Sequence, residues 1–375
     1  MKKLKKGMFL ILSAVFILLL LLSNIDYSPN IIYSENVILE DSTPCLRSKN
    51  LLIQYVRNDT LWANRDLTIY RSTDGGTSFK KQFTFSPPFL SKLYIKSNPV
   101  IRKIFGFSVN LKILAVNPIL LDINWRVYRS DNGGESFAEV NRGISPLAQG
   151  IAMDTKGNIY YGEYPSDYKG GKRVFFSSDS GLHWETLYTF YNIRHIHSVR
   201  YDKYSNKIWV TTGDWGNECL IGYLEIVEDT VLFVPILTGS QRYRAVSLLF
   251  DENYVYWGMD SPTIQNYILR YNRKTGAVEE LAAINGPAYY SMTLNNGTMV
   301  IATAVESKKG EWDDKISIWS SRNGTNWKRT ISMTKEPSKK KVLAILPNGE
   351  GSSSLVMTTT DTREFSSDLL VVKLH

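Results

Sequence analysis

Ser177-Ser178-Asp179-Ser180-Gly181-Leu182-His183-Trp184 is the third of four copies of one short phrase in this chain. The other copies occupy residues 72–79, 130–137 and 320–327. Each copy follows an apolar, aromatic run and precedes a second short run, which predicts the turn of a β-hairpin. The third-position Asp or Asn can bond its own backbone, and the fifth-position Gly can take a positive φ. The terminal Phe or Trp is expected to pack back as an anchor.

The pattern S-x-D-x-G-x-x-W resembles the Asp-box (BNR) repeat of sialidases and related β-propellers. This resemblance implies that each box joins the third and fourth strands of a propeller blade at the periphery, away from the ligand pocket. We therefore interpret the boxes as structural rather than catalytic. In the fourth copy Arg322 replaces the Asp, so Asn323 and Gly324 are expected to hold that turn instead.

The spacing of the boxes predicts the number of blades. Their first Ser residues lie at positions 72, 130, 177 and 320, and the last interval of 143 is close to three times the preceding interval of 47. Two blades without boxes should therefore lie between them, and the strand-like pairs 207–212 with 220–226 and 254–258 with 267–271 supply these. The last blade lacks a strand, which we expect residues 31–39 to provide by closing the ring. We predict an all-β, seven-bladed β-propeller.

Residues 1–30 are predicted to be a signal peptide or signal anchor, and residues 31–375 one propeller domain. Lys2, Lys3, Lys5 and Lys6 precede an apolar run from Met8 to Leu22, the pattern of a secretory signal that would form a hydrophobic helix. No A-x-A precedes a cleavage point, which favours an uncleaved membrane anchor, and the positive-inside rule then exports the propeller. The expected location is extracytoplasmic, membrane-anchored or secreted.

Composition narrows the function further. Of the formal charge of +8, four positive charges belong to the leader, so the body carries about +4 and has no aromatic-interleaved basic groove. A nucleic-acid partner is therefore not expected, whereas a modest positive bias suits an acidic polysaccharide. The two cysteines, Cys45 and Cys219, should lie on opposite sides of the ring, which argues against a disulfide between them. We expect a monomer.

Propeller geometry places on one face the loops that enter each first strand and those that leave each second strand. The residues selected in this way converge on one mouth of the central channel. They are Arg194, His195, His197, Arg242, Arg244 and Tyr290 from the entering loops, and Glu163, Tyr164, Asp214, Trp215, Asp260 and Glu306 from the leaving loops. We take His195, His197, Asp214, Asp260, Tyr290 and Glu306 as candidate catalytic residues, and Glu163, Tyr164, Arg194, Trp215, Arg242 and Arg244 as candidate substrate-binding residues.

Several of these residues allow more than one interpretation. His195 and His197 share a side of a strand, where they can bind a divalent metal, act as base and partner, or only hydrogen-bond across the channel. Arg242 and Arg244 suit carboxylate or sulfate groups, or cross-blade ion pairs with Asp214 or Asp260. Tyr289 and Tyr290 must point in opposite directions, one into the core and one toward the channel. Trp209, Trp257 and Trp319 lie inside strands and are expected to serve blade packing rather than to act as sugar platforms.

The N-terminal Arg-Ile-Pro signature of the sialidases is absent and no arginine triad can be assigned position by position, which argues against sialidase activity. Two carboxylates across a glycosidic bond would suit a glycoside hydrolase. A His and Tyr pair with charge-neutralising Arg would suit a polysaccharide lyase, with His195 or His197 and Tyr290 as base and acid. We therefore predict an exported propeller that binds or processes an acidic glycan. The alternative is a non-enzymatic propeller that binds a glycan or assists the assembly of a protein complex.

Overall fold

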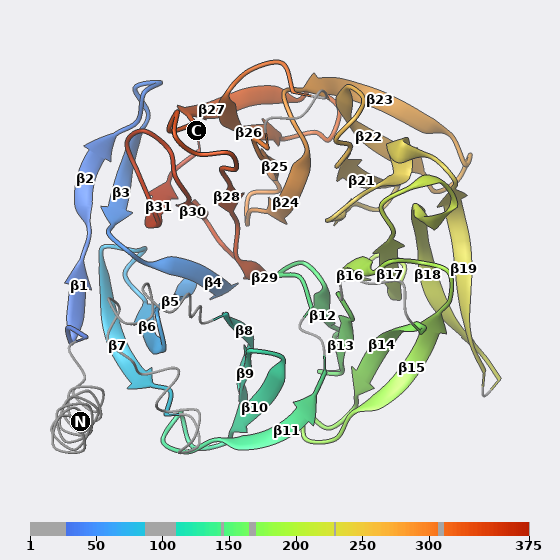
Figure 1. Ribbon diagram of the computed structural model, residues 1–375, viewed down its shortest axis with the longest axis horizontal. Coiled ribbons are helices and arrows are strands. Elements are labelled where there is room, and N and C mark those ends of the chain that lie inside the picture. The colour runs from blue at the N-terminus through green and yellow to red at the C-terminus, as the bar shows by residue number, and fades with distance from the viewer. Residues whose placement is uncertain are drawn as a thin grey trace, which may run out of the picture.

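The computed structural model describes residues 28–86, 110–143, 146–164, 170–228, 230–306 and 311–374. Within these ranges the strands form seven sheets arranged around one axis (Figure 1). This confirms the all-β, seven-bladed propeller. The helical elements of the described residues are two short 3-10 turns, η1 (Gly216–Glu218) and η2 (Gln241–Tyr243).

The predicted N-terminal hydrophobic helix lies in residues 1–27, outside the described residues. Within the part of the chain that is described, no helix is both long and apolar enough to cross a membrane.

Blades 1 to 3 each contain one meander of four antiparallel strands, numbered from the channel outward. Blade 1 comprises β4 (Leu52–Arg57), β5 (Thr60–Arg65), β6 (Thr68–Ser72) and β7 (Ser78–Thr84). Blade 2 comprises β8 (Leu111–Val116), β9 (Ile119–Ile123), β10 (Arg126–Ser130) and β11 (Ala138–Arg142). Blade 3 comprises β12 (Ile151–Met153), β13 (Ile159–Gly162), β14 (Lys172–Ser177) and β15 (Glu185–Phe190).

Blades 4 to 6 repeat this arrangement. Blade 4 comprises β16 (Ile196–Asp202), β17 (Lys207–Thr212), β18 (Leu220–Val227) and β19 (Thr230–Thr238). Blade 5 comprises β20 (Leu249–Phe250), β21 (Tyr254–Gly258), β22 (Asn266–Asn272) and β23 (Val278–Ile284). Blade 6 comprises β24 (Ala288–Thr293), β25 (Met299–Thr303), β26 (Lys315–Ser321) and β27 (Lys328–Thr334).

Blade 7 joins the two ends of the chain, but not through the strand expected from the sequence. Its order is β28 (Ala344–Ile345), β30 (Leu355–Thr359), β31 (Asp368–Val372), β3 (Pro44–Ser48) and β2 (Glu35–Ile38). The fourth strand is thus β3, and residues 31–39 do not pair with the C-terminal strand. They break at Ser34 into β2, on the outer edge of blade 7, and β1 (Ile31–Tyr33), which pairs with β7 of blade 1. The N-terminal strands therefore bridge the two blades where the ring closes.

The channel side of the same junction is bridged by β29 (Asn348–Glu350), which leaves blade 7 and pairs in parallel with β4 of blade 1. Figure 1 shows β29 beside the end of β4, near the centre of the ring. Arg200 of blade 4 donates to Asn348 across 3.4 Å, and Ser352 receives the Asn295 backbone N–H from blade 6. β29 lies in the connection between the first and second strands of blade 7. Such connections lie on the same face of the ring as the boxes, so β29 crosses the channel at that face.

The four boxes form the predicted turns between third and fourth strands, in blades 1, 2, 3 and 6. In the third box, Asp179 Oδ1 accepts the backbone N–H groups of Leu182 and His183 and the Ser177 hydroxyl. The Trp184 indole donates to the Gly181 carbonyl at 3.0 Å. In the fourth box Asn323 takes the Asp role and Gly324 receives the Trp327 indole, as expected. Blades 4 and 5 lack boxes, which confirms the interpretation of the spacing.

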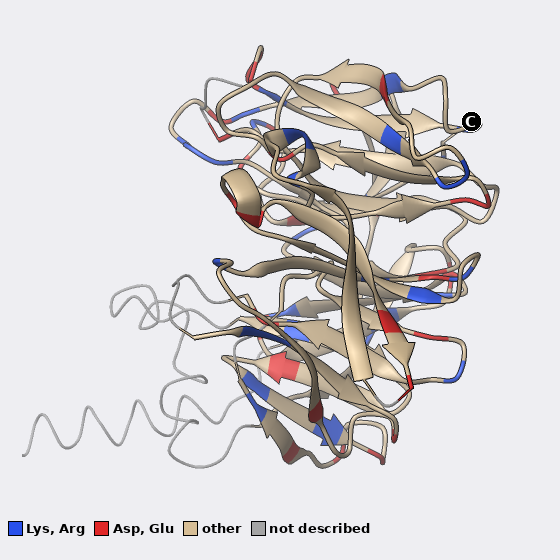
Figure 2. Ribbon diagram, turned by 90° about the vertical axis from the view of Figure 1, so that its right-hand side faces the viewer, with Lys and Arg blue, Asp and Glu red and all other residues tan. Residues whose placement is uncertain are grey.

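Each blade buries its faces against its neighbours. The cluster between blades 4 and 5 contains Trp209, Trp257 and Leu269, and Trp319 lies between blades 5 and 6, so these tryptophans pack between blades as predicted. Cys45 and Cys219 are buried and free, in blades 7 and 4. Figure 2 shows basic and acidic residues interspersed over the side of the ring, without a field of one sign.

Candidate functional site

Two β-bulges position the most polar residues of the channel. The pairing of β16 with β17 shifts between Ile196 and Ser198, which leaves His197 as the bulged residue. The pairing of β24 with β25 shifts in the same way between Ala288 and Tyr290, which leaves Tyr289. A bulge bends its strand and re-aims a side chain. Because both bulges lie at the start of a first strand, they occur at the end of the channel opposite the boxes, which we call the open face.

At this open face three side chains converge on one point. His195 Nε2 lies 2.9 Å from His197 Nε2, and each of these nitrogens lies 3.3 Å from Asp214 Oδ1. All three side chains are buried. His195 precedes β16, His197 is the bulged residue of β16, and Asp214 follows β17. Two adjacent strands of blade 4 therefore supply the whole group. We call these residues the His-His-Asp group.

Two guanidinium groups flank Asp214. Arg194 Nη1 lies 2.7 Å from Asp214 Oδ2, and Arg244 Nη2 lies 3.1 Å from Oδ1. Arg244 also binds Asp260 of blade 5, at 3.0 Å through Nε. The Arg244 guanidinium carbon lies 5.6 Å from the ring centre of Trp215, and the Tyr164 ring stacks on His195 at 4.1 Å. The open face thus has one guanidinium shared by two buried carboxylates.

The surroundings of these groups shift their pKa values in different directions. Burial lowers the pKa of His197 to about 4, although Asp214 opposes this, so the imidazole is neutral near pH 7. Burial disfavours the charge on Asp214, but hydrogen bonds from His195 and His197 and the charge of Arg244 hold its pKa well below the usual range. Burial raises the pKa of Asp260 to about 7 against the opposing charge of Arg244. Two neighbouring carboxyl groups therefore differ in protonation at neutral pH.

The opposite wall of the site comes from blade 6. Burial, the charge of Asp260 and a hydrogen bond with Glu306 raise the pKa of Tyr289 well above its ordinary value, so the phenol keeps its proton. Lys341 lies over the Tyr289 ring at 4.7 Å and pairs with Glu306. Burial and the charges of Asp214 and Asp260 raise the pKa of Tyr164 to about 12.

Three of the residues selected from the sequence direct their side chains to partners outside this group. Glu163 is buried, but its carboxylate is held within blade 3 by Arg173, at 2.6 Å. Arg242 pairs with Glu280 on the outer strand β23, because the 3-10 turn η2 directs it away from Arg244. Tyr290 packs against the apolar core between blades 6 and 7, and burial, followed by the nearby Tyr164, raises its pKa to about 12.

The remaining selected residues form one connected site, with Glu306 joined through Tyr289. Sequence reasoning named Tyr289 without selecting it, and it missed two other residues beside the site. Lys341 is half exposed and pairs with Glu306. Gln149 is buried with both side-chain amide atoms unpartnered, and its carbonyl accepts the Ser198 hydroxyl next to His197. A bulge is set by register between strands, so no local sequence signal identifies Tyr289.

The His-His-Asp group fits a divalent metal ion by donor type and by spacing. It supplies two imidazole nitrogens and one carboxylate oxygen within 4.8 Å of one another. Two His and one carboxylate on one side of an ion are a recurrent transition-metal set with open positions for other ligands. His197 is neutral and Asp214 is ionised, as metal binding requires, and an imidazole that binds the ion through Nε2 then carries its proton on Nδ1.

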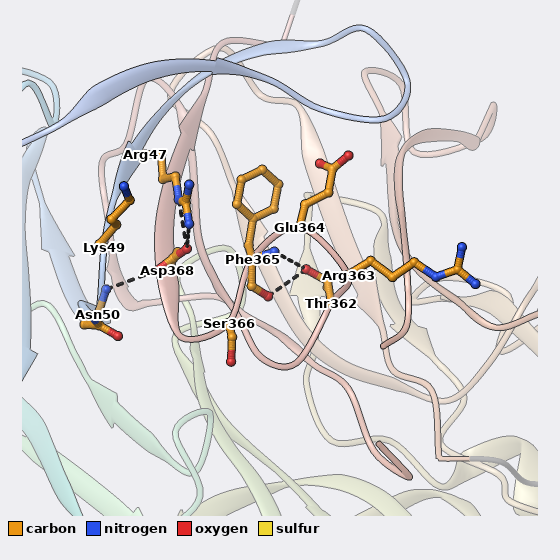
Figure 3. A pocket seen from close by; sticks show the side chains of 9 residues that line it. All are labelled: Arg47, Lys49, Asn50, Thr362, Arg363, Glu364, Phe365, Ser366 and Asp368. Carbon is orange, nitrogen blue, oxygen red and sulfur yellow. Dashed lines mark hydrogen bonds and ion pairs between the residues drawn. The ribbon is translucent and has the colours of Figure 1, made fainter. Parts of the chain in front are cut away.

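A separate polar hollow of about 280 Å³ lies where blade 7 meets blade 1. Two of its charged groups satisfy each other, since Arg47 binds Asp368 at 2.6 Å, and Asp368 also accepts the Asn50 backbone N–H. Figure 3 shows these contacts and shows Arg363 directed away from them. This hollow therefore lacks the convergent, differently ionised groups found at the channel.

Comparisons with known proteins agree on the fold. No family model and no curated protein sequence matches the chain. Among solved structures, oligogalacturonate lyase from Vibrio parahaemolyticus superposes with a TM-score of 0.58 at 10% identity, covering 92% of this chain and 98% of that chain. Oligogalacturonate lyase in complex with manganese gives a TM-score of 0.56 at 10% identity, covering 92% and 96%.

Two further structures share the architecture with other functions. YCF48 bound to D1 peptide gives a TM-score of 0.52 at 11% identity, covering 94% of this chain and 97% of that chain. The GH74 enzyme of Niastella koreensis gives 0.50 at 14% identity, covering 79% of this chain and 46% of that longer chain. Identities this low show a shared propeller fold, and carbohydrate-processing enzymes are among the proteins that have it.

Proposed function

We propose that the open face binds and cleaves an acidic glycan, and that His195, His197 and Asp214 hold a divalent cation there. The convergence of the three donor atoms, 2.9 to 3.3 Å apart in a buried site, carries this proposal. For ligands about 2.1 to 2.2 Å from an octahedral ion, adjacent donors lie about 3 Å apart, as they do here.

The arginines suit the charge of the glycan. A uronate carboxylate that reaches the site would lie beside two guanidinium groups, the partly exposed Arg194 and the more buried Arg244. Guanidinium forks match carboxylate geometry. A bound cation would supply Lewis-acid polarisation of that carboxylate.

β-Elimination is the reaction that these residues suit best. A base removes the proton on the carbon next to the uronate carboxylate, the electron pair forms a carbon–carbon double bond, and the glycosidic oxygen leaves with a proton from an acid. Asp260, with a pKa near 7, is the candidate base. Tyr289, which keeps its proton, is the candidate acid in the role that the sequence suggested for Tyr290. The histidines are then ligands rather than proton carriers.

The comparisons support this class of substrate by analogy only. One neighbour is named as an oligogalacturonate lyase and is described in complex with manganese, and another is a GH74 enzyme. We further propose that the chain is a monomeric member of the Asp-box propellers, since its four turns have the expected place and bonding. The basic and apolar segment at residues 1–30 supports export with membrane attachment.

Calorimetric titration with Mn²⁺ tests the cation site. We expect one bound ion per chain, and we expect His197→Gln to lose it. His183→Gln is a matched control, because His183 lies in the third box on the opposite face and is exposed. Absence of binding to the unchanged chain, or equal binding by the His197 variant, contradicts the proposed site.

Incubation with polygalacturonate tests the reaction. A lyase generates unsaturated products, seen by their ultraviolet absorbance, together with new reducing ends. Reducing ends without unsaturation would instead indicate a glycoside hydrolase. This is the second candidate function, and the difference in protonation between Asp214 and Asp260 favours it. Glycan binding without either product would leave a binding protein, and absence of binding would favour the assembly-factor hypothesis.

A further inference from the structure

Among the residues that the structure describes, four exposed aromatic side chains lie on the open face. Trp125 occupies the turn between β9 and β10, and Tyr191 follows β15 at the entry to blade 4. Trp215 and Trp312 lie between the second and third strands of blades 4 and 6. All four connections reach the same end of the ring, because they join second to third strands or enter first strands. Large apolar groups that remain in water on one face indicate an interaction surface.

Trp125 has a backbone conformation that its side chain does not favour. Asn124 and Trp125 form a two-residue hairpin turn, with φ of 49° and 71°. Such a turn prefers glycine at its second position, and a bulky residue with positive φ is an outlier. The Trp125 side chain is 65% exposed and therefore makes little contribution to the core. Strain of this kind at an exposed residue points to a function outside the fold.

The charges beside these aromatic residues differ between the two sides of the ring. On blade 2, Arg126 and Arg142 are both exposed and share a single partner, Glu139, which leaves positive charge next to Trp125. Tyr191 lies beside Gly171, next to the blade 3 strand that carries Arg173. On blade 6, by contrast, Trp312 stands between Glu311 and Asp313, and Asp313 is paired with Arg329 at 2.8 Å. The surplus positive charge therefore lies over blade 2, which favours an acidic chain there rather than over blade 6.

We propose that an extended acidic polysaccharide leaves the site over blades 3 and 2, with sugar rings stacked on Tyr191 and Trp125. This inference rests on the proposed function, and it adds that the substrate is a polymer bound in one direction across the face. One face of a pyranose ring presents C–H groups that pack on an aromatic ring, while its carboxylate stays free to meet arginine. Trp215, whose ring lies beside Arg244, connects the track to the His-His-Asp group.

Binding measurements with polygalacturonate and with digalacturonate test this proposal. Trp125→Gly suits the turn and should fold, and we expect it to weaken binding of the polymer by about fivefold to tenfold while binding of the dimer stays unchanged. Tyr191→Ala should behave in the same way. Trp312→Ala is the matched control, because Trp312 is equally an exposed tryptophan of the open face, and it should bind both ligands like the unchanged chain.

The outcomes separate this inference from the function on which it rests. If Trp125→Gly and Tyr191→Ala bind the polymer as tightly as the unchanged chain does, the track is overturned and the site on the axis stands. Equal weakening by Trp312→Ala also overturns it, since binding would then lack direction. If the unchanged chain binds neither ligand, the proposed function fails and the track fails with it.

Discussion

At the scale of single residues, the box aspartates act as local caps of backbone N–H groups. Asp179 accepts two such groups within the third box. We expect Asp179→Ala to lower the free energy of unfolding by about 1 kcal/mol, the usual effect of losing a cap. Urea denaturation measures this, and affinity for polygalacturonate should not change, because the box lies on the face opposite the site. Lost affinity in a variant of normal stability would place the boxes in the binding site.

Trp125 offers a second test at this scale. The left-handed region costs a non-glycine residue about 1 to 2 kcal/mol, whereas glycine loses about 0.5 to 1 kcal/mol more chain entropy on folding. Trp125→Gly should therefore leave the free energy of unfolding unchanged or raise it by up to about 1.5 kcal/mol. Trp312→Gly, at a position without positive φ, should lower it. A marked loss of stability in Trp125→Gly would show that Trp125 serves the fold.

The sequence predicts only some of the residues that form the site. The H-x-H pair, Asp214, Asp260 and Arg244 follow from strand ends and blade spacing, and the structure brings them together. Arg242 was expected to share a side with Arg244, but a 3-10 turn breaks that alternation. Tyr289 lies in a bulge, so alternation could not decide between it and Tyr290. Register shifts and short helical turns depend on partners distant in sequence, which a single strand pattern does not contain.

At the scale of elements, ring closure depends on β3. This strand joins β31 along Cys45 to Ser48, whereas β1 only adds an edge to blade 1. A chain that begins at Ser34 loses the buried Ile32 and should be less stable by about 1.5 to 3 kcal/mol. A chain that begins at Lys49 should lose more than about 4 kcal/mol, because it exposes the edge of β31 and part of two cores. Thermal unfolding compares the two chains, and similar stability in both would show that β3 is dispensable.

The closing strand also shows where sequence reasoning ends for the fold. The repeated turn fixes the third and fourth strands of four blades, and the regular interval then places the two blades without boxes. The apolar run at 31–39 suggested one strand, but Ser34 interrupts it and its hydroxyl contacts Ser48 and the Gly76 carbonyl. The true partner, β3, is short and contains Pro44 and Arg47, so neither alternation nor composition identifies it.

At the scale of the whole molecule, the seven blades bring buried ionisable groups to one axis. Asp260 and His197 titrate between pH 4 and pH 7, with opposite effects on stability. Asp260 has a folded pKa raised to about 7, so its contribution to stability falls as pH rises from about 4 to about 7. His197 has a folded pKa lowered to about 4, so its contribution rises with pH from about 4 to about 6.5. Asp214 titrates below this window.

These opposing contributions predict a flat stability profile for the unchanged chain between pH 4 and pH 6.5. Asp260→Asn removes the falling contribution, so stability of that variant should rise with pH by on the order of a few kcal/mol. His197→Gln removes the rising contribution, so stability of that variant should fall over the same range. Urea denaturation at half-unit pH intervals, without added metal, measures all three. The control variant His183→Gln should have the same profile as the unchanged chain. Parallel profiles for the Asp260 and His197 variants would contradict the opposite pKa shifts of these two residues, and with them the assignment of Asp260 as the base.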